Sequence, residues 1–223
     1  MTEKLMNETK TAWVAGANGL VGQSLLRQLD KHPNYDSIVA FVRQAPKQKP
    51  FKKVRYFVCD WHALLNSPDI FTPPTNTVDD LFCALGSTKK KTPIKSDYYR
   101  IDVEMPIAFG KLGKSHGARY YGVVSAHGAK SGAFSSYLKM KGVMEAGVQA
   151  LEIDNVTMAQ PSLLLGDRGE FRLGEKAGEA FLKLLPGNLR AIWDHDVAAA
   201  LINAAATYRG YQTLRSARMQ GSF

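Results

Sequence analysis

The chain has 223 residues, of which 45% are hydrophobic and 22% charged, and its formal net charge is +9 at pH 7. This length suits one well-cored domain, and the composition excludes a disordered or fibrous chain. The charge raises the question of nucleic-acid or anionic-lipid binding, but most lysines and arginines are scattered. We favour the alternative, a basic surface with one groove for a phosphorylated small molecule.

The first ten residues are polar and lack the apolar segment of a secretory signal, so we expect an N-terminal tail over 1–10 and a cytoplasmic protein. The alanine-rich stretch "DVAAALINAAAT" near the C-terminus is too short to span a bilayer, and no membrane span is expected. Cys59 and Cys83 have no spacing typical of a metal site. We expect both to be buried, reduced thiols.

Short β-branched runs alternate with amphipathic stretches along the chain. Strands are predicted at 11–16, 37–43, 53–60, 79–86, 118–125 and 155–160, with helices at 19–32, 95–115 and 134–150. This alternation predicts an α/β fold of the Rossmann type, a doubly wound parallel sheet with helices on both faces. After residue 161 the pattern changes to loops, a helix near 175–184 and an alanine-rich helix near 195–208. The whole chain, 1–223, is predicted to be a single domain.

The segment "GANGLVG" joins the first predicted strand to the first predicted helix. Its Gly16 suits a tight turn, Gly19 allows the backbone to approach a pyrophosphate, and Gly22 lets the helix pack close to the sheet. The helix N-terminus offers free N–H groups and a positive dipole to phosphates. We therefore expect a dinucleotide to be bound by Gly16, Ala17, Asn18, Gly19, Leu20, Val21 and Gly22.

Arg43 follows the second predicted strand, where an NAD site usually has a carboxylate. Its guanidinium suits a 2′-phosphate, so NADP(H) is predicted in preference to NAD(H); the alternative is a solvated arginine at a strand end. Asp60, after the third strand, could accept from the adenine amino group or cap the following turn. Small residues after the fourth strand are expected at the ligand crevice: Leu85, Gly86, Ser87 and Thr88.

Tyr137 and Lys141 lie four residues apart on a predicted helix, and Ser125 ends the fifth strand twelve residues before Tyr137. Reduction of a carbonyl needs a proton donor for the developing alkoxide, and a phenol beside an ammonium can supply it. A serine hydroxyl can hold the carbonyl oxygen, and the lysine can also grip the nicotinamide ribose. Such a pair arises by chance at this composition, so the prediction depends on its placement after the fifth strand.

With these motifs the sequence resembles the atypical, extended-like branch of the short-chain dehydrogenase/reductase superfamily. Within it, the sequence is similar to the small oxidoreductases related to the Tat-interacting protein, over about residues 11–220. The segments "GANGLVG", "FCALGSTKKK", "VVSAHGAKSGAFSSYLKMKG", "PSLLLGDR" and "WDHDVAAAL" carry the likeness. The resemblance implies a Rossmann fold, NADP(H) binding and a catalytic group of Ser125, Tyr137 and Lys141, and we count Pro161 among the cofactor-binding residues.

Three positions differ from the family's usual pattern. Ala126 replaces the second serine after the fifth strand, Asp102 stands where a helix asparagine positions a water, and Gln160 replaces the arginine before Pro161. In the superfamily the helices at 95–115 and 134–150 often form a dimer interface, which leaves a homodimer open. The resemblance also implies a small substrate lobe over 161–223.

Arg168 and Arg172 in that lobe could meet an acidic substrate or form surface ion pairs. His195 could carry a proton, but Asp194 or Asp196 capping the helix is the simpler reading of that cluster. His127, two residues past Ser125, lies nearer the expected site.

The sequence thus predicts an NADP(H)-dependent oxidoreductase for a small carbonyl or alcohol substrate, with an epimerase as a variant. The second hypothesis is a non-catalytic NADP(H)-binding regulator that reports redox state to a protein partner. A nucleic-acid binder is not expected, because the chain has no basic, aromatic-rich stripe.

Overall fold

The computed structural model describes residues 9–48, 50–68, 71–88, 90–166 and 190–221. Its centre is a seven-stranded sheet in the order β3-β2-β1-β4-β5-β6-β9, and each neighbouring pair is parallel. The strands are β1 (Lys10–Ala15), β2 (Tyr35–Val42), β3 (Val54–Val58), β4 (Asp80–Cys83), β5 (Tyr120–Val124), β6 (Asn155–Gln160) and β9 (Gly210–Arg215). A small separate pair joins β7 (Leu164–Leu165) to β8 (Ile192–Trp193).

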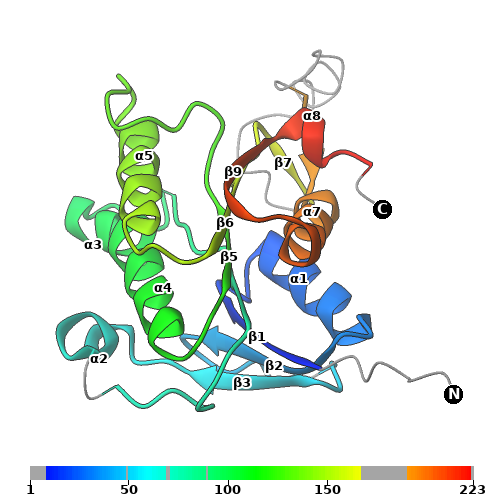
Figure 1. Cartoon of the computed structure of the whole chain (residues 1–223). Coiled ribbons are helices and arrows are strands. Elements are labelled where there is room, and N and C mark those ends of the chain that lie inside the picture. The colour runs from blue at the N-terminus through cyan, green and yellow to red at the C-terminus, as the bar shows by residue number, and fades with distance from the viewer. Residues whose placement is uncertain (1–8, 49, 69–70, 89, 167–189, 222–223) are drawn as a thin grey trace, which may run out of the picture.

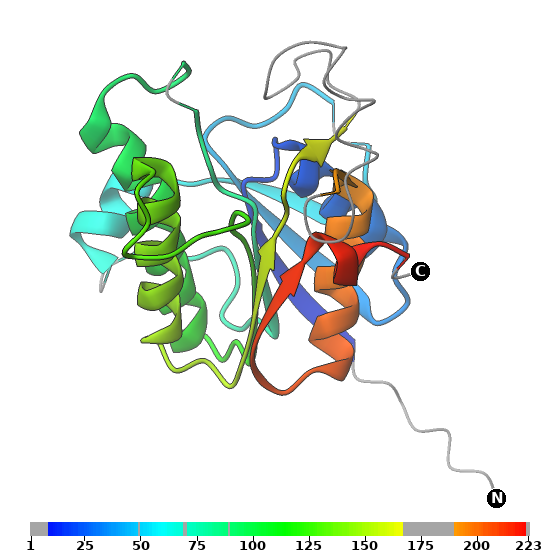
Figure 2. The ribbon, with the colours of Figure 1, turned by 90° about the horizontal axis from the view of Figure 1, so that it is seen from above.

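Helices cover both faces of the sheet, as Figures 1 and 2 show. One face carries α1 (Leu20–Lys31) and α7 (Asp194–Thr207), and the opposite face carries α4 (Met105–Ser115) and α5 (Ser136–Gln149). The described residues also form three shorter helices: α2 (Trp61–Asn66), α3 (Lys95–Tyr99) and α8 (Ser216–Met219). The predicted Rossmann-type fold is confirmed.

The central strands are apolar on both faces because each face meets a layer of helices. In β1, Ala12 and Val14 pack into the core beneath α1 and α7, whereas Trp13 and Ala15 pack into the core beneath α4 and α5. Successive side chains of a strand point to opposite faces, so a fully apolar run is what burial on both sides requires. Packing against helices on both faces holds in place the sheet that carries the site.

The sheet also fixes where a ligand can bind. The chain runs from β1 to β2 and β3 on one side, then returns to place β4, β5 and β6 on the other. The connections therefore diverge between β1 and β4, and open α/β sheets bind ligands at the carboxyl edge of such a switch point. The glycine turn follows β1 at this edge.

Several elements differ from the sequence prediction, and the short elements α2, α8, β7 and β8 were not predicted. Strand β9 was not predicted, because its sequence GYQTLR has one buried residue and looks like a polar loop. The helix predicted over 95–115 is three consecutive segments, α3, the π-helical η2 (Arg100–Glu104) and α4. Pro106 near the start of α4 lacks the N–H that would continue the regular hydrogen-bond ladder, which accounts for the interruption. The helix predicted near 175–184 lies outside the described residues.

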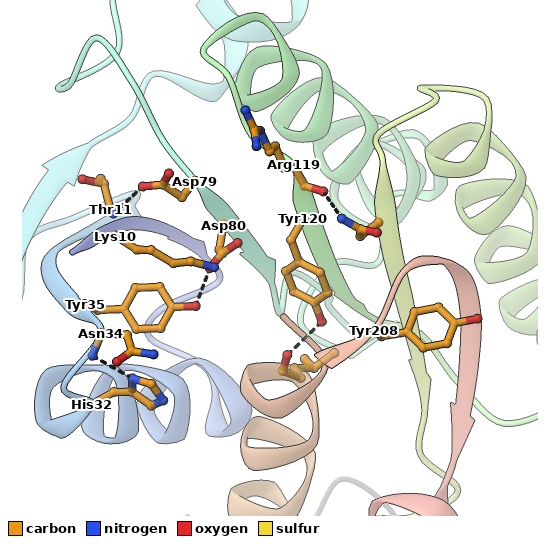
Figure 3. A network of polar contacts seen from close by, with 12 residues as sticks. Lys10, Thr11, His32, Asn34, Tyr35, Asp79, Asp80, Arg119, Tyr120 and Tyr208 are labelled. Atoms are coloured by element: carbon orange, nitrogen blue, oxygen red, sulfur yellow. Dashed lines mark hydrogen bonds and ion pairs between the residues drawn. The ribbon is translucent and has the colours of Figure 1, made fainter. Parts of the chain in front are cut away.

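At the amino edge of the sheet, a buried polar network joins the first residues of several strands (Figure 3). The Asp80 carboxylate, at the start of β4, accepts hydrogen bonds from Lys10 Nζ at 3.0 Å and from the Tyr35 hydroxyl at 2.5 Å. Lys10 begins β1 and Tyr35 begins β2. Tyr120, at the start of β5, donates to the Leu201 carbonyl of α7 at 2.8 Å. The Asp80 contacts join β1, β2 and β4, and the Tyr120 contact joins β5 to α7, at the edge opposite the ligand edge.

Candidate active site

A crevice lies at the carboxyl edge of the sheet, beside the glycine turn. It brings together the start of α1, the segments after β4 and β5, the π-helical segment η2, the first two turns of α5, and β7. Its lining residues are Gly19, Leu20, Val21, Ala84, Leu85, Gly86, Ser87, Asp102, Val124, Ser125, Tyr137, Lys141 and Leu164. Residues more than a hundred positions apart in the sequence therefore meet where the sheet topology places a ligand.

The glycine turn has the close packing that its spacing predicts. Gly16 has φ +77°, and a Cβ there would lie 2.4 Å from the Ala84 carbonyl carbon, so only glycine fits. A Cβ on Gly22 would lie 2.2 Å from the Gly16 carbonyl oxygen, so α1 starts directly against the turn. Gly19 caps α1 without a side-chain hydrogen bond, which leaves helix N–H groups to face the crevice.

Lys141 and Asp102 form a buried ion pair beneath the crevice, with Nζ and Oδ1 3.0 Å apart and side-chain exposures of 4% and 1%. The other Asp102 oxygen accepts a hydrogen bond from the Ser87 backbone N–H at 2.8 Å. Burial alone would lower the pKa of Lys141, but the Asp102 carboxylate and the nearby Tyr137 and Cys83 outweigh it and raise the pKa above its ordinary value. The site therefore contains a fixed ammonium, already paired.

Ser125 and Tyr137 bring hydroxyl groups to the crevice, together with Ser87, whose Oγ is hydrogen-bonded to Thr92. Ser125 Oγ is buried and has no partner at hydrogen-bond geometry in the part of the chain described. Glu145, one helical turn after Lys141, lies close by and accepts from Gln160 Nε2 at 2.8 Å. Burial raises the pKa of Glu145, and the nearby Ser125 hydroxyl and Gln160 amide offset part of this rise. An unsatisfied buried hydroxyl facing a crevice is a group that a bound ligand can pair.

These residues fit a dinucleotide. The turn leaves N–H groups at the N-terminus of α1, which suits phosphates. Gly86 has no side chain, so its backbone is exposed beside the ion pair of Asp102 and Lys141. Hydroxyl groups and an ammonium then follow along the same crevice, where a ribose and a reacting carbon would lie. A phenol and a serine hydroxyl beside an ammonium form a donor set that could give a proton to a substrate oxygen.

Several predicted cofactor residues lie away from the crevice lining. Arg43 is exposed directly after β2, the neighbour of β1, at the same edge of the sheet. Asp60 caps α2 by accepting from the His62 and Ala63 N–H groups at 3.0 Å each, which was the alternative reading. Contact between Asp60 and adenine stays a prediction. The flanking residues of the turn and loops do not line the crevice: Gly16, Ala17, Asn18, Gly22, Thr88 and Pro161.

In the C-terminal part, Arg168 and Arg172 lie outside the described residues. The prediction that Asp194 or Asp196 caps its helix is wrong. Trp193 holds the cap position of α7, and both aspartates lie in its first turn, where the helix dipole favours them. Asp194 accepts from Ser24 Oγ at 2.5 Å, so this carboxylate joins α7 to α1. The side chain of His195 stacks on Trp193, with ring centroids 5.9 Å apart.

Sequence reasoning missed part of the crevice. Ala84, Val124 and Leu164 line it but carry no chemical signature in the sequence. Glu145 did carry a signal, since it continues the four-residue spacing of Tyr137 and Lys141 along α5. The ring Nδ1 of His127 is buried and has no hydrogen-bond partner among the described residues. The backbone N–H of His127 donates to the Pro161 carbonyl at 2.9 Å. It does not line the crevice.

Known proteins are similar to this chain in sequence. Protein HTATIP2 of Rattus norvegicus is 27% identical over 188 residues, which cover 83% of this chain and 76% of that protein. Protein FMP52 of Kluyveromyces lactis, named as mitochondrial, is 31% identical over 172 residues, which cover 74% and 73% of the two chains. No protein-family model matches the sequence.

Solved structures agree in fold. The Bordetella bronchiseptica enzyme WbmG in complex with NAD superimposes with a TM-score of 0.66 at 15% identity, over 95% of this chain and 74% of WbmG. The oxidoreductase ylbE of Lactococcus lactis also gives 0.66 at 15% identity, over 92% and 90%.

No helix in the described part of the chain is both long enough and apolar enough to cross a bilayer. With 31% identity over almost three quarters of each chain, the protein belongs to the family of FMP52 and is also similar to HTATIP2, and its fold is that of the solved Rossmann-type structures above.

Proposed function

We propose that this protein is an NADP(H)-dependent oxidoreductase that acts on a small carbonyl or alcohol substrate. The observation that carries the proposal is the convergence of Ser125, Tyr137 and Lys141 with the glycine turn in one crevice. Two proteins of the same fold support it: WbmG is an enzyme in complex with NAD, and ylbE is an oxidoreductase. One neighbour is a UDP-N-acetylglucosamine 4-epimerase, so epimerase chemistry with the same group is the related alternative.

In this mechanism each residue has a stated task. The Ser125 hydroxyl donates a hydrogen bond to the substrate carbonyl oxygen and so orients the carbonyl carbon. The Tyr137 hydroxyl then gives its proton to the oxygen as negative charge develops there. The Lys141 ammonium holds the ribose of the cofactor and stabilises the phenolate that remains. When bound, the nicotinamide supplies or accepts the hydride.

The preference for NADP(H) over NAD(H) rests on Arg43. This residue is exposed after β2, beside the strand that leads into the glycine turn. A guanidinium binds a 2′-phosphate through two parallel hydrogen bonds. Neighbouring structures contain NAD, so the phosphate preference depends on this chain's own residue.

A cofactor titration and a carbonyl-substrate screen, on wild type and Tyr137→Phe, test the proposal. We expect NADPH binding in both proteins and turnover in wild type alone, because the variant keeps the ring and loses the proton. Failure of wild type to bind either dinucleotide would refute it. Binding without turnover of any substrate by wild type would instead support the non-catalytic regulator.

Arg43→Ala tests the cofactor choice. We expect it to weaken NADPH binding by about 10- to 100-fold, in line with the loss of a charge-assisted hydrogen bond, and to leave NADH binding unchanged. Lys47→Ala, at an exposed lysine in the same loop, is the matched control. An equal loss of NADPH and NADH affinity would contradict the 2′-phosphate assignment.

Three further parts of the proposal depend on separate measurements. We propose a cytoplasmic location, with which the free, buried thiols of Cys59 and Cys83 are compatible, whereas FMP52 relatives are named as mitochondrial; fractionation of cells decides between them. A homodimer through α4 and α5, which pack on one face of the sheet, is tested by light scattering. We propose no nucleic-acid partner, and salt-dependent DNA binding would oppose that view.

A further inference from the structure

We propose that Asp102 is a positioning residue that fixes the Lys141 ammonium at the floor of the crevice and keeps it charged across the neutral and alkaline pH range. This inference rests on the proposed cofactor site, because Lys141 is the group that would hold the ribose. It goes beyond that proposal by naming the residue that controls the lysine.

Asp102 contacts two separate parts of the crevice. One carboxylate oxygen pairs with Lys141 Nζ of α5 at 3.0 Å, and the other accepts from the Ser87 N–H of the β4 loop at 2.8 Å. Gly86 faces the pair, since a Cβ built there would lie 3.4 Å from Asp102 Oδ1 and 3.7 Å from Lys141 Nζ. The carboxylate thus fastens the lysine to the loop that would carry the cofactor ribose.

The backbone around Asp102 places its carboxylate there. Asp102 and Val103 are the buried residues of the π-helical segment η2, while Arg100 and Glu104 of the same segment remain substantially exposed. Single π-helical turns occur frequently at functional sites, because the additional residue re-aims the side chains of that turn. The departure from regular α-helix falls where the buried carboxylate meets Lys141.

Charge explains why the pairing matters. The other titratable groups that face Lys141 are Tyr137 and Glu145 from its own helix and Cys83 from β4. Burial raises the pKa of the Cys83 thiol, and the Glu145 carboxylate is hydrogen-bonded to Gln160. Asp102 is the carboxylate in direct contact. Without it, burial would disfavour the charged form of the lysine.

The test uses Asp102→Asn, which keeps the volume and an acceptor for the Ser87 N–H but removes the charge. NADPH binding is followed by its fluorescence between pH 6.5 and 10. We expect wild-type affinity to stay nearly constant, and the variant to lose about tenfold per pH unit once its lysine deprotonates. Asp97→Asn, at an exposed aspartate of α3 that pairs with Arg100, is the control and should behave as wild type.

A purely structural role would leave this pH profile unchanged, so parallel profiles for Asp102→Asn and wild type would overturn the inference. A second measurement needs no cofactor: labelling of Lys141 with acetic anhydride at increasing pH, quantified by mass spectrometry. We expect the midpoint of labelling to fall in Asp102→Asn, and equal midpoints would also overturn the inference. If wild type does not bind NADPH, the proposed function is refuted. The labelling midpoints then test the role of Asp102 independently.

Asp102→Asn could also fail to fold, because it leaves a buried ammonium unpaired. The double variant Asp102→Asn, Lys141→Met removes both charges, and its unfolding is compared with that of each single variant. We expect the double variant to be more stable than Asp102→Asn alone. A double variant at least as unstable as the sum of the two singles would show no coupling between the groups and overturn the inference.

Discussion

Gly22 is the residue at which the first helix comes closest to the glycine turn. The Gly16 carbonyl oxygen occupies the space that a Cβ on Gly22 would fill, so the start of α1 is held close to the end of β1. This close approach of α1 to the turn is possible because Gly22 has no Cβ. Its effect on binding is therefore testable by a single substitution.

We expect Gly22→Ala to lower the free energy of unfolding by about 1–3 kcal/mol, because the new Cβ would lie 2.2 Å from a backbone oxygen and α1 must move. Weaker dinucleotide binding should accompany the change. Urea denaturation and NADPH titration measure the two effects. Gly132→Ala is the control, since a Cβ there meets nothing within 4 Å. Equal results for the two variants would count against the close contact at Gly22.

Strands β1, β2 and β4 are joined at their first residues by the network around Asp80 (Figure 3). Burial raises the pKa of Asp80 despite the opposing contacts from Tyr35 and Lys10, so this carboxylate depends on its donors. Strands β1 and β4 lead directly into segments that line the crevice. Their alignment there is held from the opposite edge of the sheet.

Tyr35→Phe should lower the free energy of unfolding by about 1.5–3 kcal/mol, the usual contribution of a hydrogen bond to a charged group. Tyr208→Phe removes an exposed hydroxyl that donates to the Tyr211 carbonyl at 3.0 Å, and we expect less than about 0.5 kcal/mol there. Urea denaturation of both variants provides the comparison. A loss at Tyr208 as large as that at Tyr35 would argue that the buried network adds no stability.

The elements also show how far the sequence can be interpreted. Buried runs such as SIVAFVR predict strands because both faces must be apolar, whereas β9 lies at the sheet edge and has one buried residue. The four-residue spacing of Tyr137 and Lys141 places them on one helix face, and topology brings Ser125 beside them. The pairing of Asp102 with Lys141 joins two helical segments through tertiary packing, which local sequence patterns do not encode.

At the scale of the whole molecule, several buried cysteine and tyrosine side chains hold their protons more tightly in the folded protein than in the unfolded chain. Burial raises the pKa of Cys59 to about 12, and burial likewise raises the pKa of Cys83 and of the tyrosines Tyr35, Tyr120 and Tyr121. Unfolded cysteines and tyrosines lose their protons near pH 8.5 and 10, respectively. Above these values the unfolded chain binds fewer protons than the folded one. Stability must then fall as pH rises.

We therefore expect the free energy of unfolding to decrease between about pH 8.5 and 10.5, with a slope of up to about 1.4 kcal/mol per pH unit for each proton retained by the folded state. Urea denaturation at pH 7.5, 9 and 10.5 measures it. Cys59→Ala removes one contributor and should flatten the early part of the curve. Stability that stays constant or rises over this range would contradict the burial of these groups.

Gly86 offers a way to separate two roles of the protein inside a cell. A methyl group there makes ordinary contacts with the charge pair below, so a larger apolar side chain, as in Gly86→Leu, would occupy the crevice from within. The exterior would keep every residue through which the protein could meet others. A phenotype that this allele shares with a gene deletion belongs to the crevice, and one that it lacks belongs to the surface.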